Sequence, residues 1–133
     1  MPKTWEEKFQ NGKSPKITLL RKAAAGMQPG QRMLVGTPPM YAAYIQSIPT
    51  GQLRSVQTLR DDLAREAGAD TTCPLTTGIF LRIVAERAWD QYLGGKPLDE
   101  ITPFWRVIDP QAPLAKKLRC GSSFIANKRK NER

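Results

Sequence analysis

Apolar residues recur at helical spacing in three stretches of the chain. Each stretch opens with a residue that suits a helix start: Pro39 and Pro74 can take a first helical position, and Ser55 can cap the first turn. Each stretch ends at a glycine or a proline, residues that terminate helices. The pattern therefore predicts three helices, over about residues 39–48, 56–67 and 74–93.

The same spacing predicts which sides of the third helix face the solvent and the core. Arg82, Glu86 and Asp90 line one side and are expected to point outward. The opposite side is apolar apart from one arginine and is expected to be buried; it consists of Ile79, Phe80, Ile83, Val84 and Arg87.

The rest of the chain lacks such periodicity. Gly and Pro interrupt residues 1–38 so densely that we expect an extended N-terminal arm, in which 5–10 could form one or two helical turns. Residues 69–73 and 98–113 are expected to be loops, and a short last helix is expected at about 122–130. These patterns divide the chain into an extended N-terminal arm at 1–38, a domain at 39–125 and a basic tail at 126–133.

The order helix, tight turn, helix, loop, helix predicts a fold class. It is the layout of a helix-turn-helix or winged-helix unit, in which the helix after the second turn enters a groove of DNA. With 133 residues the chain has the size of one domain, typically ~100–150 residues. We therefore expect a mainly α, winged-helix-like single domain with an extended basic N-terminal arm. The alternative is a small helical domain without a nucleic-acid role.

The charge of the chain is strongly positive and lies at its two ends. Lys and Arg total 21 against 12 Asp and Glu, a formal charge of +9. Residues 1–22 hold six basic and two acidic side chains, and residues 116–133 hold seven and one. Such an excess commonly accompanies an anionic partner, and nucleic acid is the first candidate. Contacts of the C-terminal basic clusters with phosphates would add affinity rather than specificity.

Several classes of chemistry are excluded by composition. The chain has no His, which excludes a His general base, a Cys-His nucleophile pair and an imidazole zinc site. Cys73 and Cys120 lie 47 positions apart without metal-ligand spacing, so we expect neither a metal nor a cofactor. We also expect the cysteines to be reduced and the protein to be cytoplasmic, and nucleoid-associated if it is bacterial. The longest apolar run has six residues, against ~18 for a membrane span, so no membrane partner is expected.

Several short motifs occur in a characteristic order. They are Ile-Pro-Thr-Gly at 48–51, Leu-Ala at 63–64, Thr-Gly at 77–78 and Pro-Phe-Trp-Arg-Val-Ile at 103–108. Over roughly residues 40–125 the chain resembles the DNA-binding domain of O6-alkylguanine-DNA alkyltransferases. The resemblance implies a winged-helix fold, duplex DNA as the partner, and a pocket for an alkylated guanine extruded from the duplex.

The departures from that family change the expected function. The family's nucleophilic Cys falls at Phe104 and its His at Trp105, so alkyl transfer at that site is not expected. The chain is similar to the alkyltransferase-like branch, in which an aromatic residue replaces the Cys and the protein binds alkylated guanine without repairing it. We therefore expect a non-enzymatic DNA-binding protein that senses such lesions and flags them to a repair partner.

Two other functions stay open. One is a DNA-binding or adaptor module on the same scaffold without lesion recognition, acting through a protein partner. The other is an enzyme that uses Cys73, because a thiol beside a helix N-terminus can have a lowered pKa. A lone cysteine without a base is more often a small buried hydrophobe.

The resemblance also implies roles for individual residues. The lesion pocket is expected at Pro103, Phe104, Trp105 and Arg106, whose two rings either stack on an extruded base or belong to the core. The family's tyrosine falls near Arg60, a candidate phosphate clamp, and its arginine finger near Leu75, a candidate apolar wedge.

The start of the third helix is the other part of the expected interface. Thr76, Thr77 and Gly78 allow close backbone approach to a groove, unless Gly78 only serves tight helix packing. The 25 residues between Gly78 and Phe104 exceed the family's spacing and imply a reshaped pocket. The residues expected to bind DNA are Arg60, Leu75, Thr76, Thr77, Gly78, Arg82, Arg106, Lys128 and Arg129.

Overall fold

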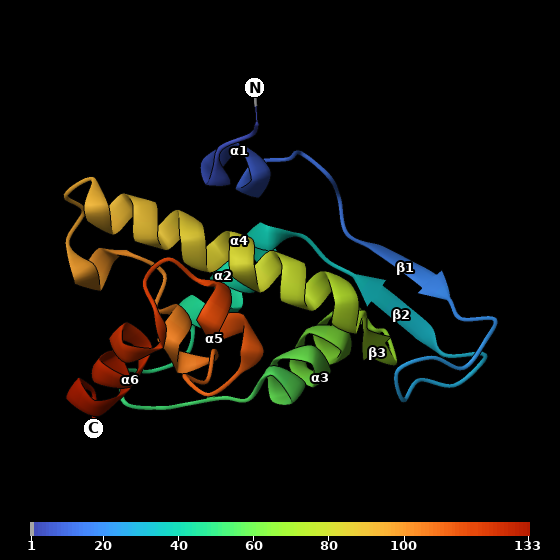
Figure 1. Cartoon of the computed structure of the whole chain (residues 1–133). Coiled ribbons are helices and arrows are strands. Elements are labelled where there is room, and N and C mark those ends of the chain that lie inside the picture. The colour runs from blue at the N-terminus through green and yellow to red at the C-terminus, as the bar shows by residue number, and fades with distance from the viewer. Residues whose placement is uncertain (1) are drawn as a thin grey trace.

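Most of the regular elements in the computed structural model, which describes residues 2–133, are helices (Figure 1). The Ser55 side chain accepts a hydrogen bond from the Thr58 N–H at the start of the second central helix, and Gly68 ends that helix in the left-handed conformation, with φ 74°. The mainly α fold class and the three central helices are confirmed. These helices are α2 (Pro38–Gln46), α3 (Val56–Ala67) and α4 (Pro74–Leu93).

Shorter helical elements surround the central three. The expected last helix is present as α6, and the expected loop at 98–113 contains two 3-10 turns. The shorter elements are α1 (Trp5–Phe9), η1 (Leu98–Glu100), η2 (Phe104–Arg106), α5 (Pro113–Lys117) and α6 (Ser122–Asn131).

The expectation that residues 1–38 form an extended arm is wrong, although the helical turns that 5–10 could form are present as α1. Besides α1, this segment contains two strands, β1 (Lys16–Leu19) and β2 (Arg32–Val35), which pair antiparallel. The expected loop at 69–73 contains β3 (Thr71–Thr72), which pairs parallel to β2. Strand pairing depends on partners that are distant along the chain, so neither strand pair leaves a local periodic pattern to detect.

The N-terminal helix α1 packs against α4. Its Thr4 forms a capping box with Glu7, in which each side chain accepts a hydrogen bond from the other residue's backbone N–H. Glu6 pairs with Arg87 of α4, and the Arg87 guanidinium lies 3.9 Å from the centre of the buried Phe9 ring. The N-terminal segment is therefore an integral part of the fold.

One hydrophobic core joins the N-terminal segment to the central helices and to α6. Phe9 and Leu34 belong to the same cluster of buried residues as Ile125. Two expectations for α4 are wrong: Ile79 is 49% exposed, and Glu86 is only 1% exposed. Arg119, from the segment between α5 and α6, covers Glu86 and bonds to it at 2.9 Å. Ile79 lies on the outer side of the first turns of α4, whose inner side holds the buried Thr77.

Candidate nucleic-acid interface

The first two turns of α4 carry an exposed stripe of apolar and small residues. Leu75 is 73% exposed and Ile79 is 49% exposed, and with Gly78 they lie on one side of the helix at i, i+3, i+4 spacing. No described atom lies within 4 Å of a Cβ placed on Gly78, so tight packing inside the protein does not explain this glycine. We call Leu75, Gly78 and Ile79 the α4 stripe.

The inner side of the same turns holds the helix in place. The buried Thr77 hydroxyl donates to the Cys73 carbonyl at 2.7 Å and lies 2.8 Å from the Tyr41 hydroxyl of α2. Burial raises the pKa of Tyr41, which therefore stays protonated at neutral pH. The Thr76 hydroxyl lies 3.5 Å from the Cys73 carbonyl. The Thr77 side chain is thus used by the fold, and it sets the direction of the α4 stripe.

Two arginines that were expected to contact DNA are occupied by neighbours within the protein. Arg60 donates through Nε to the Thr72 carbonyl at 3.0 Å, and the Thr72 hydroxyl donates back to the Arg60 carbonyl at 2.7 Å. Arg82 was expected to point outward, but its guanidinium lies 5.5 Å from the centre of the Trp5 ring. Arg60 thus joins α3 to β3, and Arg82 lies against the N-terminal helix α1.

The aromatic pair of the 103–108 segment lies in the core. Phe104 is 0% and Trp105 is 3% exposed. The Phe104 ring stacks on Phe124 of α6, with centres 6.1 Å apart, and meets the Trp105 ring edge to face at 5.4 Å. Of the two alternatives for these rings, the structure shows the core location. The Phe104 ring is not placed to stack on a base, whereas Trp105 also contributes to the wall of a cavity described below.

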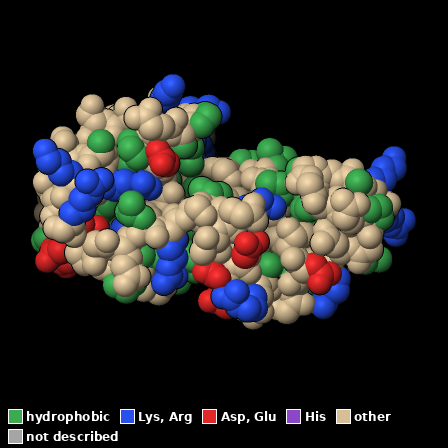
Figure 2. Space-filling view, turned by 90° about the horizontal axis from the view of Figure 1, so that it is seen from below, with side chains coloured by type: hydrophobic (Ala, Val, Ile, Leu, Met, Phe, Trp, Pro, Cys, Tyr) green, Lys and Arg blue, Asp and Glu red, His purple; other side chains and the backbone are tan. Residues whose placement is uncertain are grey.

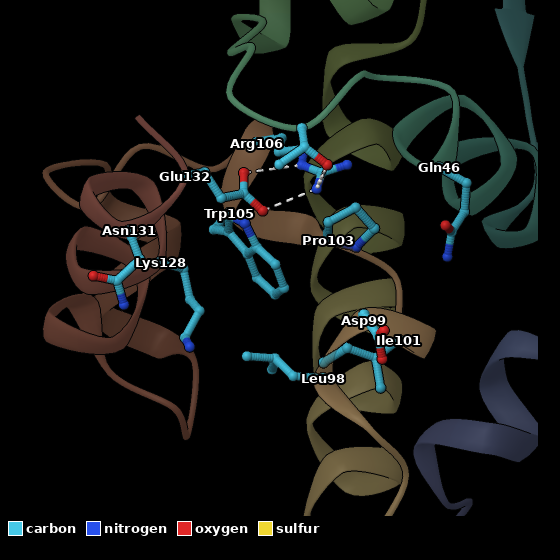
Figure 3. A pocket seen from close by; sticks show the side chains of 11 residues that line it. Gln46, Leu98, Asp99, Ile101, Pro103, Trp105, Arg106, Lys128, Asn131 and Glu132 are labelled. Atoms are coloured by element: carbon cyan, nitrogen blue, oxygen red, sulfur yellow. Dashed lines mark hydrogen bonds and ion pairs between the residues drawn. The ribbon is translucent and has the colours of Figure 1, made fainter.

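Arg106 ties the Ile-Pro-Thr-Gly turn to the C-terminal end of the chain. Its guanidinium donates to the Ile48 carbonyl at 2.8 Å and to the Glu132 carboxylate at 2.9 and 3.0 Å (Figure 3). Burial raises the pKa of Glu132, but the hydrogen bonds from Arg106, the nearby N–H groups of the Trp105 ring and the Gly51 backbone, and the positive charge of Arg106 together outweigh it, so that the pKa is lowered overall. Gly51 has φ 87°, and a Cβ there would lie 2.9 Å from the Glu132 carbonyl oxygen. Arg106 and the motif at 48–51 therefore form one structural unit.

The basic residues of α6 that were expected to contact DNA also face the protein. Arg129 donates through Nε to the Trp105 carbonyl at 2.7 Å and lies 3.8 Å from the Asp109 carboxylate. Lys128 is half-buried, with Nζ 5.5 Å from the centre of the Phe124 ring. Arg129 thus joins α6 to the 103–108 segment, whereas Lys128 lies against a ring of its own helix.

Two cavities lie beside the 103–108 segment. The larger, of about 530 Å³, includes Pro103, Trp105 and Arg106 in its wall, but Phe104 does not line it (Figure 3). The smaller, of about 300 Å³, has a mostly apolar lining that sequence reasoning missed: Leu53, Arg54, Ser55, Val56, Val107, Ile108, Asp109, Ala112, Leu114 and Arg129. The exposed Leu53 just after the glycine turn was the available signal for it.

The sequence-predicted site is thus divided between two regions. At 1.5 Å per residue, the 20 residues of α4 span about 30 Å. The α4 stripe lies at the N-terminal end of this helix, whereas the larger cavity is lined by Leu98 and Ile101, which follow its C-terminal end. Residues 75–79 and 103–106 therefore do not form a single cluster.

The two cysteines are free and lie apart from each other. Cys73 is the N-cap residue of α4 and is partly exposed; its N–H donates to the Leu34 carbonyl at 2.9 Å. Burial raises the pKa of Cys120 to about 11. Within residues 2–133, no group of three His, Cys, Asp or Glu residues is placed to hold a metal ion.

Comparisons of the chain with protein-family models, with characterised proteins and with solved structures give no match. Among the described residues, no helix combines the length and the apolar character needed to cross a membrane.

Proposed function

We propose that this protein binds duplex DNA through a winged-helix-like unit, without alkyl-transfer activity. In this proposal α3 and α4 are the two helices of a helix-turn-helix, and the N-terminal end of α4 enters a groove. The observation that carries the proposal is the α4 stripe, in which two apolar side chains flank a glycine on an exposed helix face that the fold does not use.

The stripe has the chemistry that a groove contact requires. Gly78 lets another backbone approach the helix closely, and Leu75 is long enough to act as an apolar wedge against a base step. The first N–H groups of a helix favour a phosphate oxygen, because they are unpaired within the helix and lie at the positive end of its dipole. Thr77 and Tyr41 hold these groups in a fixed direction.

The absence of alkyl transfer rests on the side chains at 104 and 105. The buried Phe104 ring stands where the resembling family has its nucleophile, and no His exists in the chain to activate one. A role in repair would then depend on binding DNA and on a protein partner, rather than on chemistry performed by this chain.

Sensing of O6-alkylguanine is a second candidate function, and the smaller cavity favours it. The volume of this cavity lies at the lower end of the ~300–1,000 Å³ typical of small-molecule pockets. Val56 in the first turn of α3 and Ile108 contribute apolar lining, and Arg54 contributes a hydrogen-bond donor. An extruded base would enter this cavity rather than stack on Phe104 or Trp105.

The DNA-binding proposal is tested with two matched variants of α4. Leu75→Glu and Leu93→Glu change the same residue type, at exposed positions at opposite ends of one helix, and lower the net charge equally. We expect roughly tenfold weaker binding of a labelled duplex for Leu75→Glu, measured by fluorescence anisotropy, and little change for Leu93→Glu. No binding by the wild type at low salt would contradict DNA binding and leave the adaptor function.

Lesion sensing is tested with a duplex that contains one O6-methylguanine and with its unmodified twin. A preference for the modified duplex that Val56→Trp removes, by filling the smaller cavity, would support sensing. Equal affinities of the wild-type protein for both duplexes would contradict it and leave general DNA binding.

A further inference from the structure

The β1–β2 hairpin and the segment that leads into it carry positive charge that the fold does not use. Lys13, Lys16, Arg21 and Lys22 are all exposed. Between residues 8 and 60 the chain contains no Asp or Glu at all. Within the part of the chain that the structure describes, none of the four side chains makes an ion pair or a hydrogen bond. Their charges are therefore free to meet an external anion.

The hairpin is rigidly attached to the turn that starts α4. The Asp70 and Cys73 N–H groups donate to the Arg32 and Leu34 carbonyls of β2, each at 2.9 Å. The Arg32 guanidinium donates to the Gly68 carbonyl at 2.8 Å. These bonds hold β2 against residues 68–73, immediately before the α4 stripe. A duplex that engages the stripe would therefore meet the hairpin in a defined position.

The hairpin also reaches far enough to contact a second part of the duplex. It forms one end of the molecule, opposite to α6 (Figure 1), and Lys and Arg side chains lie at its tip, on the right of Figure 2. From Lys16 to Lys22 an extended chain covers at most about 20 Å. The major groove of DNA is about 12 Å wide. The upper limit of this span exceeds the groove width, so the length of the hairpin permits its cations to contact phosphates beyond the groove that holds α4.

Protection of an open strand edge explains only part of this charge. β1 is an edge strand with the exposed apolar residues Ile17 and Leu19, and a lysine on such a strand discourages pairing with other chains. Arg21 and Lys22 lie beyond the end of β1, where they do not guard its edge.

We propose that the β1–β2 hairpin is a second DNA contact, which binds backbone phosphates flanking the groove occupied by α4. This inference rests on the proposed DNA binding and names a surface outside the resembling motifs. The contact adds affinity without base specificity, because phosphates carry no sequence information. It also assigns the external phosphate contacts to the hairpin rather than to the C-terminal basic residues, several of which are occupied inside the fold.

The test compares two triple variants of the full-length protein that reduce the positive charge equally. One replaces cations of the hairpin, and the other replaces exposed lysines at the opposite end of the molecule. Both are checked for folding by circular dichroism, and binding of one unmodified duplex is measured over a series of salt concentrations. The variants are Lys16→Gln/Arg21→Gln/Lys22→Gln and Lys116→Gln/Lys117→Gln/Lys130→Gln.

We expect the hairpin variant to bind more weakly and with a shallower dependence of log affinity on log salt. The slope should fall by about 0.9 for each phosphate that the variant no longer neutralises, or about 2.7 for three. The C-terminal variant should keep most of the wild-type slope. Equal reductions in both variants would show an effect of net charge alone and overturn the inference.

Failure of the hairpin contact and failure of DNA binding give different results. Wild-type affinity and slope in the hairpin variant, together with weakened binding by Leu75→Glu, would overturn the hairpin contact and leave the proposed function intact. No duplex binding by the wild type at low salt would overturn both.

Discussion

The N-terminal end of α4 and the 103–108 segment differ in what the fold does with their motif residues. At the start of α4, Leu75 and Gly78 are exposed and make no contact that the fold requires. In the 103–108 segment, Phe104 and Trp105 are buried and Arg106 is bonded to Glu132 and Ile48. Both segments were expected from the sequence to contact DNA. The first presents its side chains on an open helix face, whereas the second uses its side chains in the core and in the wall of the larger cavity.

The difference follows from the size of the side chains in the 103–108 segment. Under the proposed resemblance, a small Cys and a polar His would stand at the positions of Phe104 and Trp105. Two large rings at these positions gain far more from packing against Phe124 than from exposure, because burial of an aromatic side chain removes a large apolar area from water. A ring that serves the core is no longer free to stack on a base.

The largest expected effect in this comparison is on stability, from Trp105→Ala. Removal of this buried ring should lower the free energy of unfolding by ~3–5 kcal/mol, measured by urea denaturation. The molecules that remain folded should show equal changes in their binding to alkylated and to unmodified DNA. Leu75→Ala, at an exposed site, is the control and should change stability little. A selective decrease in binding to modified DNA would contradict a purely structural role of Trp105, because it would place this side chain in a lesion site.

A smaller stability effect is expected for the partly buried ion pair of Arg106 and Glu132. Because the pKa of Glu132 is lowered in the folded state, its contribution is present above the ordinary value of 4.5 and is lost as the pH falls through the lowered pKa. We expect Glu132→Gln to cost about 2 kcal/mol at pH 7 and to show weaker acid destabilisation than wild type in urea melts. Parallel destabilisation of both proteins with falling pH would contradict this role.

Gly78→Leu, at the start of α4, should change the stability of the protein and its affinity for DNA in opposite directions. No described atom obstructs a side chain at this position, and replacing a helical glycine reduces the entropy lost on folding, so stability should rise by up to about 1 kcal/mol. Binding to duplex DNA should weaken, because the new side chain prevents close approach. Gly78→Ala is the matched control, with a similar gain in stability and a smaller decrease in affinity. Unchanged binding by Gly78→Leu would contradict a DNA contact at the start of α4.

The smallest expected effect is an absence of reaction. Incubation with duplex that contains O6-methylguanine should leave the protein's mass unchanged by mass spectrometry, since under the proposed resemblance Phe104 takes the nucleophile's position. A stoichiometric gain of one methyl group that Cys73→Ser abolishes would instead assign catalysis to the N-cap cysteine of α4.

The sequence alone determined the three central helices and the ends of two of them, α3 and α4; α2 runs from Pro38 to Gln46 rather than over 39–48. Pro39, Ser55, Gly68 and Pro74 act through their own backbone and cap preferences, which depend only on nearby residues. The exposed stripe of α4 was partly predictable for the same reason: Leu75 and Gly78 were recognised as contact residues from a local motif. Ile79, however, was expected in the core, since its spacing does not show which face of the first turns of α4 the rest of the fold covers.

Only the tertiary structure decided the remaining features. The hairpin at 16–35 depends on pairing between strands and with β3, and the burial of Glu86 depends on Arg119, which is 33 positions away. The bonds of Arg60, Arg106 and Arg129 likewise join segments that are distant along the chain. The sequence shows only an arginine, whether its guanidinium binds a phosphate or a backbone carbonyl. The partner is determined by tertiary packing and not by the neighbouring residues in the chain.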